Sequence, residues 1–295
     1  MCGRYTLTSS PEAVRALFGY DEQPNFPARY NIAPTQPIGI VRLVRDQAEW
    51  EPVSRPDRAQ NSKNGARPDA KPVPTFAGRA PGKRHFALVR WGLLPSWVKD
   101  PKAFSLVINA RGESVAAKPA FRAAMKRRRC LIPADGFYEW KAGAPRKQPY
   151  YIHAKSGAPL AFAGLWETWT GPNGEELDTA AIVTTTANAT LAPLHDRMPV
   201  IIPPDEFDRW LGKGDIESSV DAALAQTLIR PAPDELLEAW PVSTDVNRVA
   251  NDNPKLLELF TGPLGGEPGL APIRKRAKAA KVEKAKKNDG QGVLF

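Results

Sequence analysis

The stretch RRCLIPADGFYEW, residues 128–140, contains two short apolar and aromatic runs that Pro, Asp and Gly separate. Runs of this length and composition favour β-strands, and the residues between them favour a turn. The pattern recurs in FALVRWG (86–92), PYYIHA (149–154), LAFAGLWETW (160–169) and AAIVTTTAN (180–188). So many short strands predict a mostly antiparallel sheet that is strongly curved and barrel-like.

Helical signals lie toward the two ends of the chain. In SSPEAVRALFG (9–19), Ser10 suits the N-cap, Pro11 the first turn and Gly19 the stop. The sequence also predicts a strand in IGIVRLV (38–44) and helices in PPDEFDRWLG (203–212), SVDAALAQTLI (219–229) and NPKLLELF (253–260). Central strands with helices at the ends predict an α+β fold with peripheral helices.

Two segments differ in composition from the rest of the chain. Residues 54–84 are rich in Pro, Gly and charge, which predicts a long flexible loop inserted between strands. Residues 266–295 are predicted to be a basic disordered tail, so the domain is expected to span residues 2–265. The formal charge of +9 is concentrated in the tail, where residues 274–287 hold eight Lys and Arg against one acidic residue. This tail either contacts nucleic acid or is a solvated end.

Composition also excludes several classes of protein. Only two cysteines are present, Cys2 and Cys130, which are too few for a disulfide framework or a Cys-rich zinc site. No apolar stretch is long enough for a transmembrane span, and no signal peptide is recognisable. We therefore expect a cytoplasmic protein without a metal or cofactor, and we expect Cys130, inside a strand, to be buried and inert.

Cys2 follows the initiator methionine directly. Bacterial methionine aminopeptidases generally remove Met1 when the second side chain is small, and removal leaves a free α-amine beside the thiol. The reference pKa is about 7.7–8.0 for the amine and about 8.5 for the thiol. Such a 1,2-aminothiol captures an aldehyde as a five-membered thiazolidine. Cys2, exposed at the terminus, is thus a candidate nucleophile, and the alternative is an incidental second residue.

Candidates for proton transfer are a histidine and a carboxyl group. His85 borders the predicted loop and is expected at the surface, whereas His153 lies in a strand and is expected to be structural. His195 lies in LHDRMPVII (194–202), where a polar cluster leads into an apolar strand, as is typical of the rim of a site. Glu139 lies among aromatic residues, and desolvation would favour its neutral form, which suits proton transfer near neutral pH.

Other side chains suit nucleic-acid binding. INARGES (108–114) places Asn109 and Arg111 on one face of an extended segment, and arginine binds phosphate with two N–H groups. WGLLPSW (91–97) supplies Trp91 and Trp97, which either stack on bases or belong to the core.

Taken together, these stretches resemble one family, the SOS response-associated peptidases, also described as abasic-site processing proteins. The resemblance spans residues 2–260. Eight stretches carry it in order: MCGRYTLT (1–8), YNIAPTQ (30–36), WGLLPSW (91–97), INARGES (108–114), RRCLIPADGFYEW (128–140), GLWETW (164–169), IVTTTAN (182–188) and LHDRMPVII (194–202).

The resemblance implies binding of single-stranded DNA that carries an abasic site, and capture of the ring-opened sugar aldehyde as a thiazolidine crosslink. It implies four catalytic residues: Cys2 as nucleophile, Asn109 to position the sugar, Glu139 as acid–base and His195 for Schiff-base chemistry. It further implies DNA contacts from Arg4, Arg111 and Arg197 at the backbone, from Pro34, Trp140 and Thr184 along a groove, and from Trp97 as a stacking wedge. Lyase activity and self-processing of the peptidase type are also family properties.

The chain ends in DGQGVLF (289–295), in which Gln291, Leu294 and Phe295 form a Q-x-x-L-F pattern similar to bacterial sliding-clamp-binding peptides. We expect a monomer whose partners are damaged single-stranded DNA and, through this peptide, the sliding clamp at replication forks. Two alternatives remain open on the residues alone. They are a cysteine protease that uses Cys2, Glu139 and His195, and a single-strand binding module without chemistry.

Overall fold

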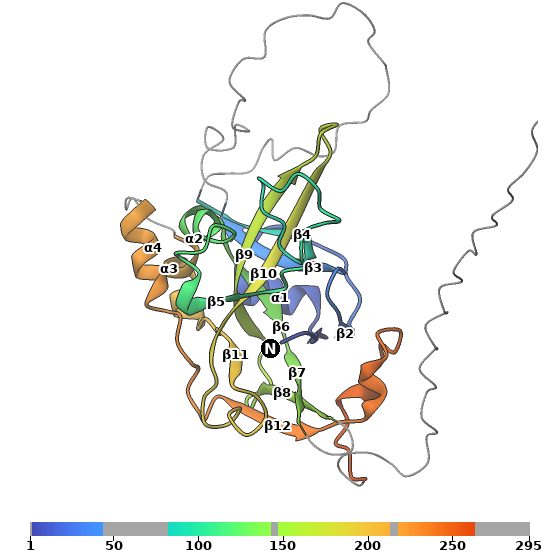
Figure 1. Cartoon of the computed structure of the whole chain (residues 1–295). Coiled ribbons are helices and arrows are strands. Elements are labelled where there is room, and N and C mark those ends of the chain that lie inside the picture. The colour runs from blue at the N-terminus through green and yellow to red at the C-terminus, as the bar shows by residue number, and fades with distance from the viewer. Residues whose placement is uncertain (1, 44–81, 143–146, 213–217, 263–295) are drawn as a thin grey trace, which may run out of the picture.

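Five strands pair in a closed circuit and form a barrel (Figure 1). In order around it they are β3 (Pro37–Leu43), β4 (Arg84–Trp91), β10 (Glu176–Thr186), β9 (Leu160–Thr170) and β6 (Arg129–Ala134), which returns to β3. Two further strands, β5 (Asn109–Arg111) and β11 (Arg197–Pro199), pair with β10. The computed structural model describes residues 2–43, 82–142, 147–212 and 218–262.

A second sheet of five antiparallel strands packs beside the barrel. Its order is β12 (Leu237–Pro241), β8 (Gln148–Ala154), β7 (Gly136–Lys141), β1 (Tyr5–Leu7) and β2 (Arg29–Ile32). Aromatic rings join the two sheets: Tyr5 and Phe137 each meet Phe162 of β9 edge to face, with ring centroids 6.2 and 5.7 Å apart. The buried core therefore lies between the barrel and this sheet.

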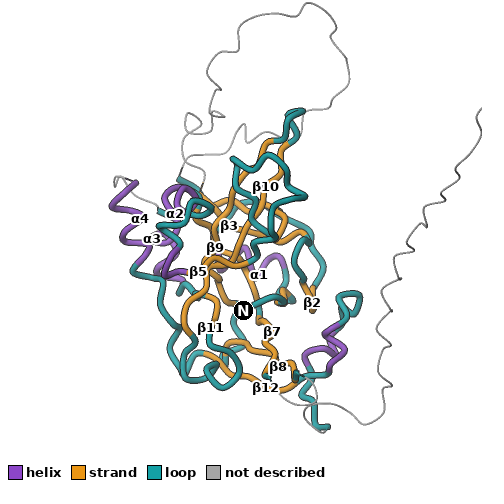
Figure 2. The backbone as a smooth tube through the Cα atoms, viewed as in Figure 1, coloured by secondary structure: helices purple, strands orange, loops and turns teal. Residues whose placement is uncertain are grey.

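The helices are short and lie at the periphery (Figure 2). They are α1 (Pro11–Phe18), α2 (Arg122–Arg127), α3 (Phe207–Leu211) and α4 (Ser218–Gln226), with 3-10 turns η2 (Gly112–Ser114), η3 (Pro204–Glu206), η4 (Thr244–Asn247) and η5 (Pro254–Leu257). Helix α1 has the predicted ends: the Ser10 hydroxyl accepts from the Ala13 amide at 3.2 Å, and Gly19 has a φ of 67°. That left-handed conformation favours glycine.

The predicted fold class is confirmed, and five details differ from the prediction. The sheet is divided in two, and β10 pairs with β4 and β5 in parallel. Helix α2 was not predicted. The predicted helix at 253–260 shortens to η5, because the Phe260 amide donates to the Pro241 carbonyl at 2.8 Å and draws the chain away from a helical path. His85, predicted at the surface, is 5% exposed, because β4 already includes it and its Nδ1 lies 2.8 Å from Glu22 Oε1.

Several predictions fall on residues that the structure leaves undescribed. They concern Met1, the predicted loop as far as residue 81, the predicted tail (266–295) and its residues Gln291, Leu294 and Phe295. Cys130 is buried as predicted, with no exposed surface, and burial raises the pKa of its thiol.

Candidate active site and DNA-binding surface

Cys2 lies in the core rather than at an exposed end of the chain. Cys2 has no exposed surface, and its thiol donates to the Arg4 carbonyl at 3.7 Å. The expectation of an exposed Cys2 is therefore wrong. The reason is that β1 follows at once, and the Tyr138 amide of β7 donates to the Arg4 carbonyl at 3.0 Å, which draws the first residues into the sheet. Burial raises the pKa of the Cys2 thiol, and the charge of Glu139 raises it further.

Asn109 fixes the backbone of Cys2. Its side-chain Nδ2 donates to the Cys2 carbonyl at 2.9 Å. The other end of the amide, Oδ1, is buried and has no hydrogen-bond partner among the described residues. Strand β5, which carries Asn109, is held in place by parallel pairing with β10, with Asn109 opposite Ile182. The site thus contains a buried acceptor whose hydrogen-bonding capacity is unused among the described residues.

Glu139 is the buried acid of the site. It lies on β7, which pairs with β1 so that Tyr5 is opposite Phe137, and only 2% of the residue is exposed. Burial raises the pKa of the Glu139 carboxyl, and the neighbouring charge of His195 opposes that rise. A carboxyl with a raised pKa keeps its proton closer to neutral pH, as proton transfer requires.

His195 has a partner for its ring in either protonation state. Its Nδ1 accepts from the Arg197 amide at 2.9 Å, which places the hydrogen of the neutral ring on Nε2. The same Nδ1 lies 2.8 Å from Asp196 Oδ1, which can accept from the ring once it is protonated. The four predicted catalytic residues therefore come together from four segments: the N-terminal residues, β5, β7 and the turn before β11.

The residues predicted to contact DNA differ in whether their side chains are already bonded within the protein. Arg111 is exposed at the end of β5. Arg197 donates from Nη1 and Nη2 to the two carboxylate oxygens of Glu113, at 2.7 and 2.9 Å, and from Nη2 to the Thr184 carbonyl at 2.7 Å. Thr184 is fully buried beneath this pair, so its side chain contacts Arg197 rather than lining an open groove.

Arg4 and Trp140 both hold η4 against the sheet. Arg4 Nη1 donates to Asn31 Oδ1 at 2.8 Å and to the Val246 carbonyl at 2.7 Å. The Trp140 indole donates to Asn247 Oδ1 at 2.7 Å. Arg4 is therefore engaged in intramolecular bonds, and burial lowers the pKa of its guanidinium.

Pro34 and Trp97 lie in loops. Pro34 is half-buried in the turn between β2 and β3, next to Thr35, whose φ is 72°. Trp97 is 58% exposed in the segment between β4 and β5, where it meets the Phe104 ring edge to face at 5.8 Å. Trp91 differs from it, since it is fully buried and belongs to the core.

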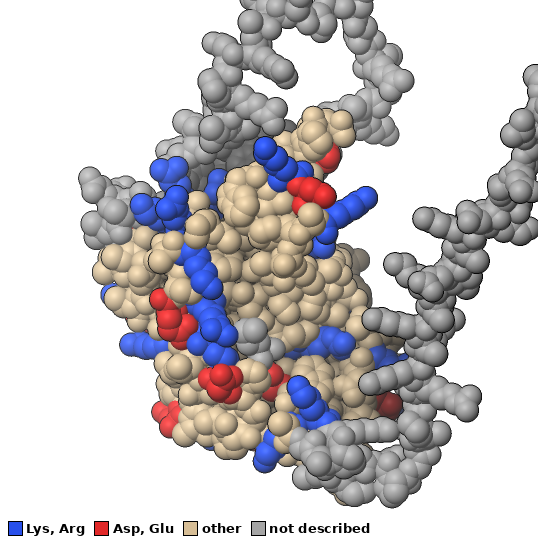
Figure 3. Space-filling model, in the orientation of Figure 1, with Lys and Arg blue, Asp and Glu red and all other residues tan. Residues whose placement is uncertain are grey.

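Basic side chains form a band over the part of this face where β5 and β11 lie, with acidic side chains at its margins (Figure 3).

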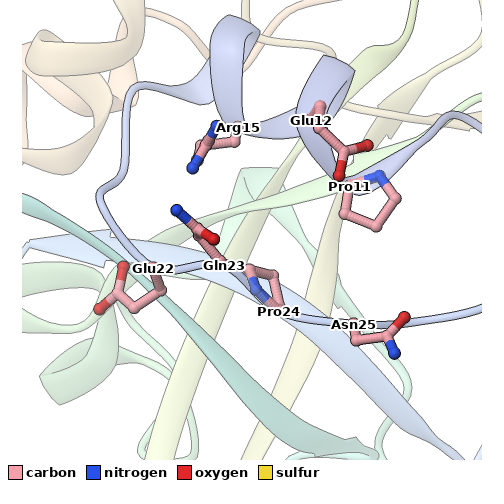
Figure 4. Close-up of a pocket in the computed structure, with 7 residues that line it drawn as sticks. All are labelled: Pro11, Glu12, Arg15, Glu22, Gln23, Pro24 and Asn25. Atoms are coloured by element: carbon pink, nitrogen blue, oxygen red, sulfur yellow. The ribbon is translucent and has the colours of Figure 1, made fainter.

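A separate hollow lies between α1 and residues 22–25 (Figure 4), and none of the predicted catalytic residues line it. Among the described residues, no group of three or more His, Cys, Asp and Glu could hold a metal ion. Within the same residues, no helix is both long and apolar enough to cross a membrane.

Comparison with known proteins decides the family. A family model described as SOS response associated peptidase (SRAP) matches residues 1–249. The chain belongs to the SOS response associated peptidase family. Its relatives in the family include the abasic site processing protein YoqW of Bacillus subtilis, 35% identical over 88% of this chain and 99% of that protein. Another is the abasic site processing protein HMCES of Xenopus tropicalis, 31% identical over 87% of this chain and 78% of that protein.

Solved structures have the same fold. A protein of Bacteroides thetaiotaomicron superposes with a TM-score of 0.66 at 21% identity, over 88% of this chain and all of the other. A phage-related protein of Bordetella bronchiseptica superposes with a TM-score of 0.54 at 30% identity, over 82% of this chain and 94% of the other.

The motifs that indicated the family did not single out three residues of the site. Glu113 lies inside INARGES and binds Arg197. Asn247 lies in η4 and binds Trp140. Tyr5 follows the Cys-Gly-Arg start, is fully buried, and has no partner for its hydroxyl among the described residues. Among these three, Glu113 had a signal in the sequence, because it lies two residues after Arg111, a candidate phosphate-binding arginine.

Proposed function

We propose that this protein captures the ring-opened aldehyde of an abasic site in single-stranded DNA through Cys2, as a thiazolidine, after removal of Met1. The observation that carries the proposal is the convergence at Cys2. Asn109 Nδ2 donates to the Cys2 carbonyl at 2.9 Å. The buried carboxyl of Glu139, whose pKa is raised, interacts electrostatically with the Cys2 thiol. The family membership and the names of the relatives agree with DNA carrying an abasic site as substrate.

The first step is attack of the Cys2 α-amine on the sugar aldehyde. A C–N bond forms, the carbonyl oxygen takes a proton, and the resulting carbinolamine loses water to give an imine. Loss of water needs a proton donor, and Glu139, whose pKa is raised by burial, is suited to supply it. His195, with partners for both protonation states, is suited to accept the proton that the nitrogen loses as the imine forms, which leaves Glu139 as a carboxylate; on ring closure His195 gives that proton back to the nitrogen.

The second step is ring closure. The Cys2 sulfur attacks the imine carbon, the C–S bond forms, the thiol loses its proton, and the former imine nitrogen takes its proton back. Aldehyde and aminothiol have then given a thiazolidine and one molecule of water. Burial raises the pKa of the thiol, so a base is needed at the moment of attack, and the Glu139 carboxylate formed in the first step serves as that base.

DNA is held, in this proposal, through its phosphates and by stacking. Arg111 is exposed at the end of β5, and Trp97 is largely exposed in the segment between β4 and β5. Phosphate contacts position a strand without reading its sequence, and stacking on aromatic rings favours unpaired bases. We therefore expect little sequence preference, strong dependence on salt and a preference for single strands.

The test is incubation of the protein with a single-stranded oligonucleotide that bears one abasic site. We expect an adduct that survives heating, with a mass equal to protein without Met1 plus DNA minus one water. Cys2→Ala should abolish the adduct, whereas Cys130→Ala, which removes the other buried thiol, should leave it intact. A variant that retains an extra residue before Cys2 should bind DNA without forming the adduct. An adduct that persists in Cys2→Ala, or in the extended variant, would refute the proposal. Cleavage of peptides by the wild-type protein without any DNA adduct would favour a cysteine protease instead.

A further inference from the structure

Glu113 and Arg197 form a bidentate ion pair next to the candidate active site. The two carboxylate oxygens accept from Arg197 Nη1 and Nη2 at 2.7 and 2.9 Å. Arg197 Nη2 also donates to the Thr184 carbonyl at 2.7 Å. The arginine side chain is 12% exposed and that of Glu113 is 50% exposed, so the pair is reached from solvent on the side of Glu113.

In this geometry, few N–H donors of Arg197 remain available to bind a phosphate. A guanidinium has five N–H donors, and the fork between its two Nη atoms is the edge that matches a carboxylate or a phosphate. Here Glu113 occupies that fork, while Nε is buried and has no partner among the described residues. A phosphate that binds Arg197 with two hydrogen bonds must therefore displace the carboxylate.

Glu113 is also close to the second candidate phosphate ligand. The hydrogen bonds from Arg197, together with the charges of Arg197 and Arg111, lower the pKa of the Glu113 carboxyl against the opposing effect of burial. The carboxylate is thus ionised at neutral pH, between two arginines. An anion in this place opposes a DNA phosphate twice, since it occupies one arginine and repels the incoming charge.

We propose that Glu113 is a specificity-determining residue that weakens the hold of the protein on undamaged single-stranded DNA by competing with phosphate for Arg197. The inference rests on the proposed function. Weak reversible binding lets the protein leave DNA that has no aldehyde, whereas at an abasic site the covalent bond retains it. Glu113 therefore increases the ratio of capture at lesions to residence elsewhere.

The experiment measures the affinity of the full chain for an undamaged oligonucleotide by fluorescence anisotropy over a range of salt concentrations. Glu113→Gln keeps the size of the side chain and removes its charge, and we expect about three- to fivefold tighter binding, the scale of a partly exposed ion pair. Glu176→Gln is the charge-matched control, because Glu176 is exposed at the start of β10, on the hairpin far from β5 and β11 (Figure 1). It should leave the affinity unchanged.

A second background tests whether the effect acts through Arg197. In Arg197→Gln, adding Glu113→Gln should tighten binding clearly less than it does in the wild type, because no fork remains to be released and only the repulsion of the incoming charge is removed. With undamaged competitor in excess, adduct formation at an abasic site should slow more in Glu113→Gln than in the wild type. Unchanged or weaker binding by Glu113→Gln, or equal tightening in both backgrounds, would overturn the inference and leave the proposed function standing. Failure of the wild type to bind single-stranded DNA at all would overturn both.

Discussion

Replacing Arg4 by Met should destabilise the fold, although the family resemblance places this arginine at the DNA backbone. Its Nη1 donates to Asn31 Oδ1 at 2.8 Å and to the Val246 carbonyl at 2.7 Å, and its Nη2 reaches the Asn247 carbonyl at 3.4 Å. The bonds to Val246 and Asn247 join the N-terminal segment to η4, and Val246 is 242 residues away from Arg4 in the chain. Methionine keeps the aliphatic volume and loses all three.

The size of the loss follows from the number and quality of these bonds. A hydrogen bond from a charged donor contributes about 1.5–3 kcal/mol, and Arg4 makes two short ones. Two facts reduce the sum: Arg4 is only half-buried, and the Val246 carbonyl still accepts from Asn31 Nδ2 at 3.1 Å. We expect the free energy of unfolding to fall by about 2–3 kcal/mol, and Tm to fall by roughly 5–10 °C in a domain of this size.

The assay is thermal and urea unfolding followed by circular dichroism, with Arg111→Met as the matched control. Arg111 is exposed, so its replacement should change the free energy of unfolding by no more than about 0.5 kcal/mol. If the two variants unfold at the same temperature, the structural role assigned to Arg4 is refuted.

Three further outcomes are expected. Glu139→Gln should be more stable than the wild type at pH 7, because a carboxyl whose pKa is raised in the fold costs stability as pH rises through its unfolded value; the gain, followed by urea unfolding, should vanish below about pH 4, where both states are protonated. Arg111→Met should weaken binding of single-stranded DNA and lower the salt slope by about 1, and an unchanged slope would place Arg111 away from phosphate. Cys130 should stay unmodified by iodoacetamide in the native protein and react in urea, as peptide mapping will report; native modification would contradict its burial.

Local sequence signals predicted those parts of the fold that local physics determines. Helix α1 could be placed because Ser10 and Gly19 act on their own neighbours. The alternating and aromatic runs identified the long strands β9 and β10 for the same reason. The segment at 253–260 has an equally helical composition, yet the long-range bond between Phe260 and Pro241 decides its path. No pattern inside the segment contains that information.

The candidate site, like the fold, could be predicted from the sequence only in part. Motif order brought Asn109, Glu139 and His195 to attention, because each residue type suits its chemistry. The burial of Cys2 could not be predicted, since it depends on the register in which β1 pairs with β7. The engagement of Arg197 by Glu113 was equally out of reach, because the two residues are 84 positions apart and meet only once β5 and β11 both pair with β10.

Unsatisfied polar atoms beside Cys2 bear on what the site is for. Leaving a buried donor or acceptor without a partner costs about 1–3 kcal/mol, and folded proteins largely avoid it. Yet the Tyr5 hydroxyl and Asn109 Oδ1 are buried, and neither has a hydrogen-bond partner within the described part of the chain. Burial, and then the charge of Cys2, raises the pKa of Tyr5, so its hydroxyl keeps its proton and can donate, whereas Asn109 Oδ1 can only accept. A core selected for stability alone would replace both with apolar groups. A donor and an acceptor retained beside a buried thiol can bind a molecule with hydroxyl groups of its own, such as the ring-opened sugar of the proposed substrate.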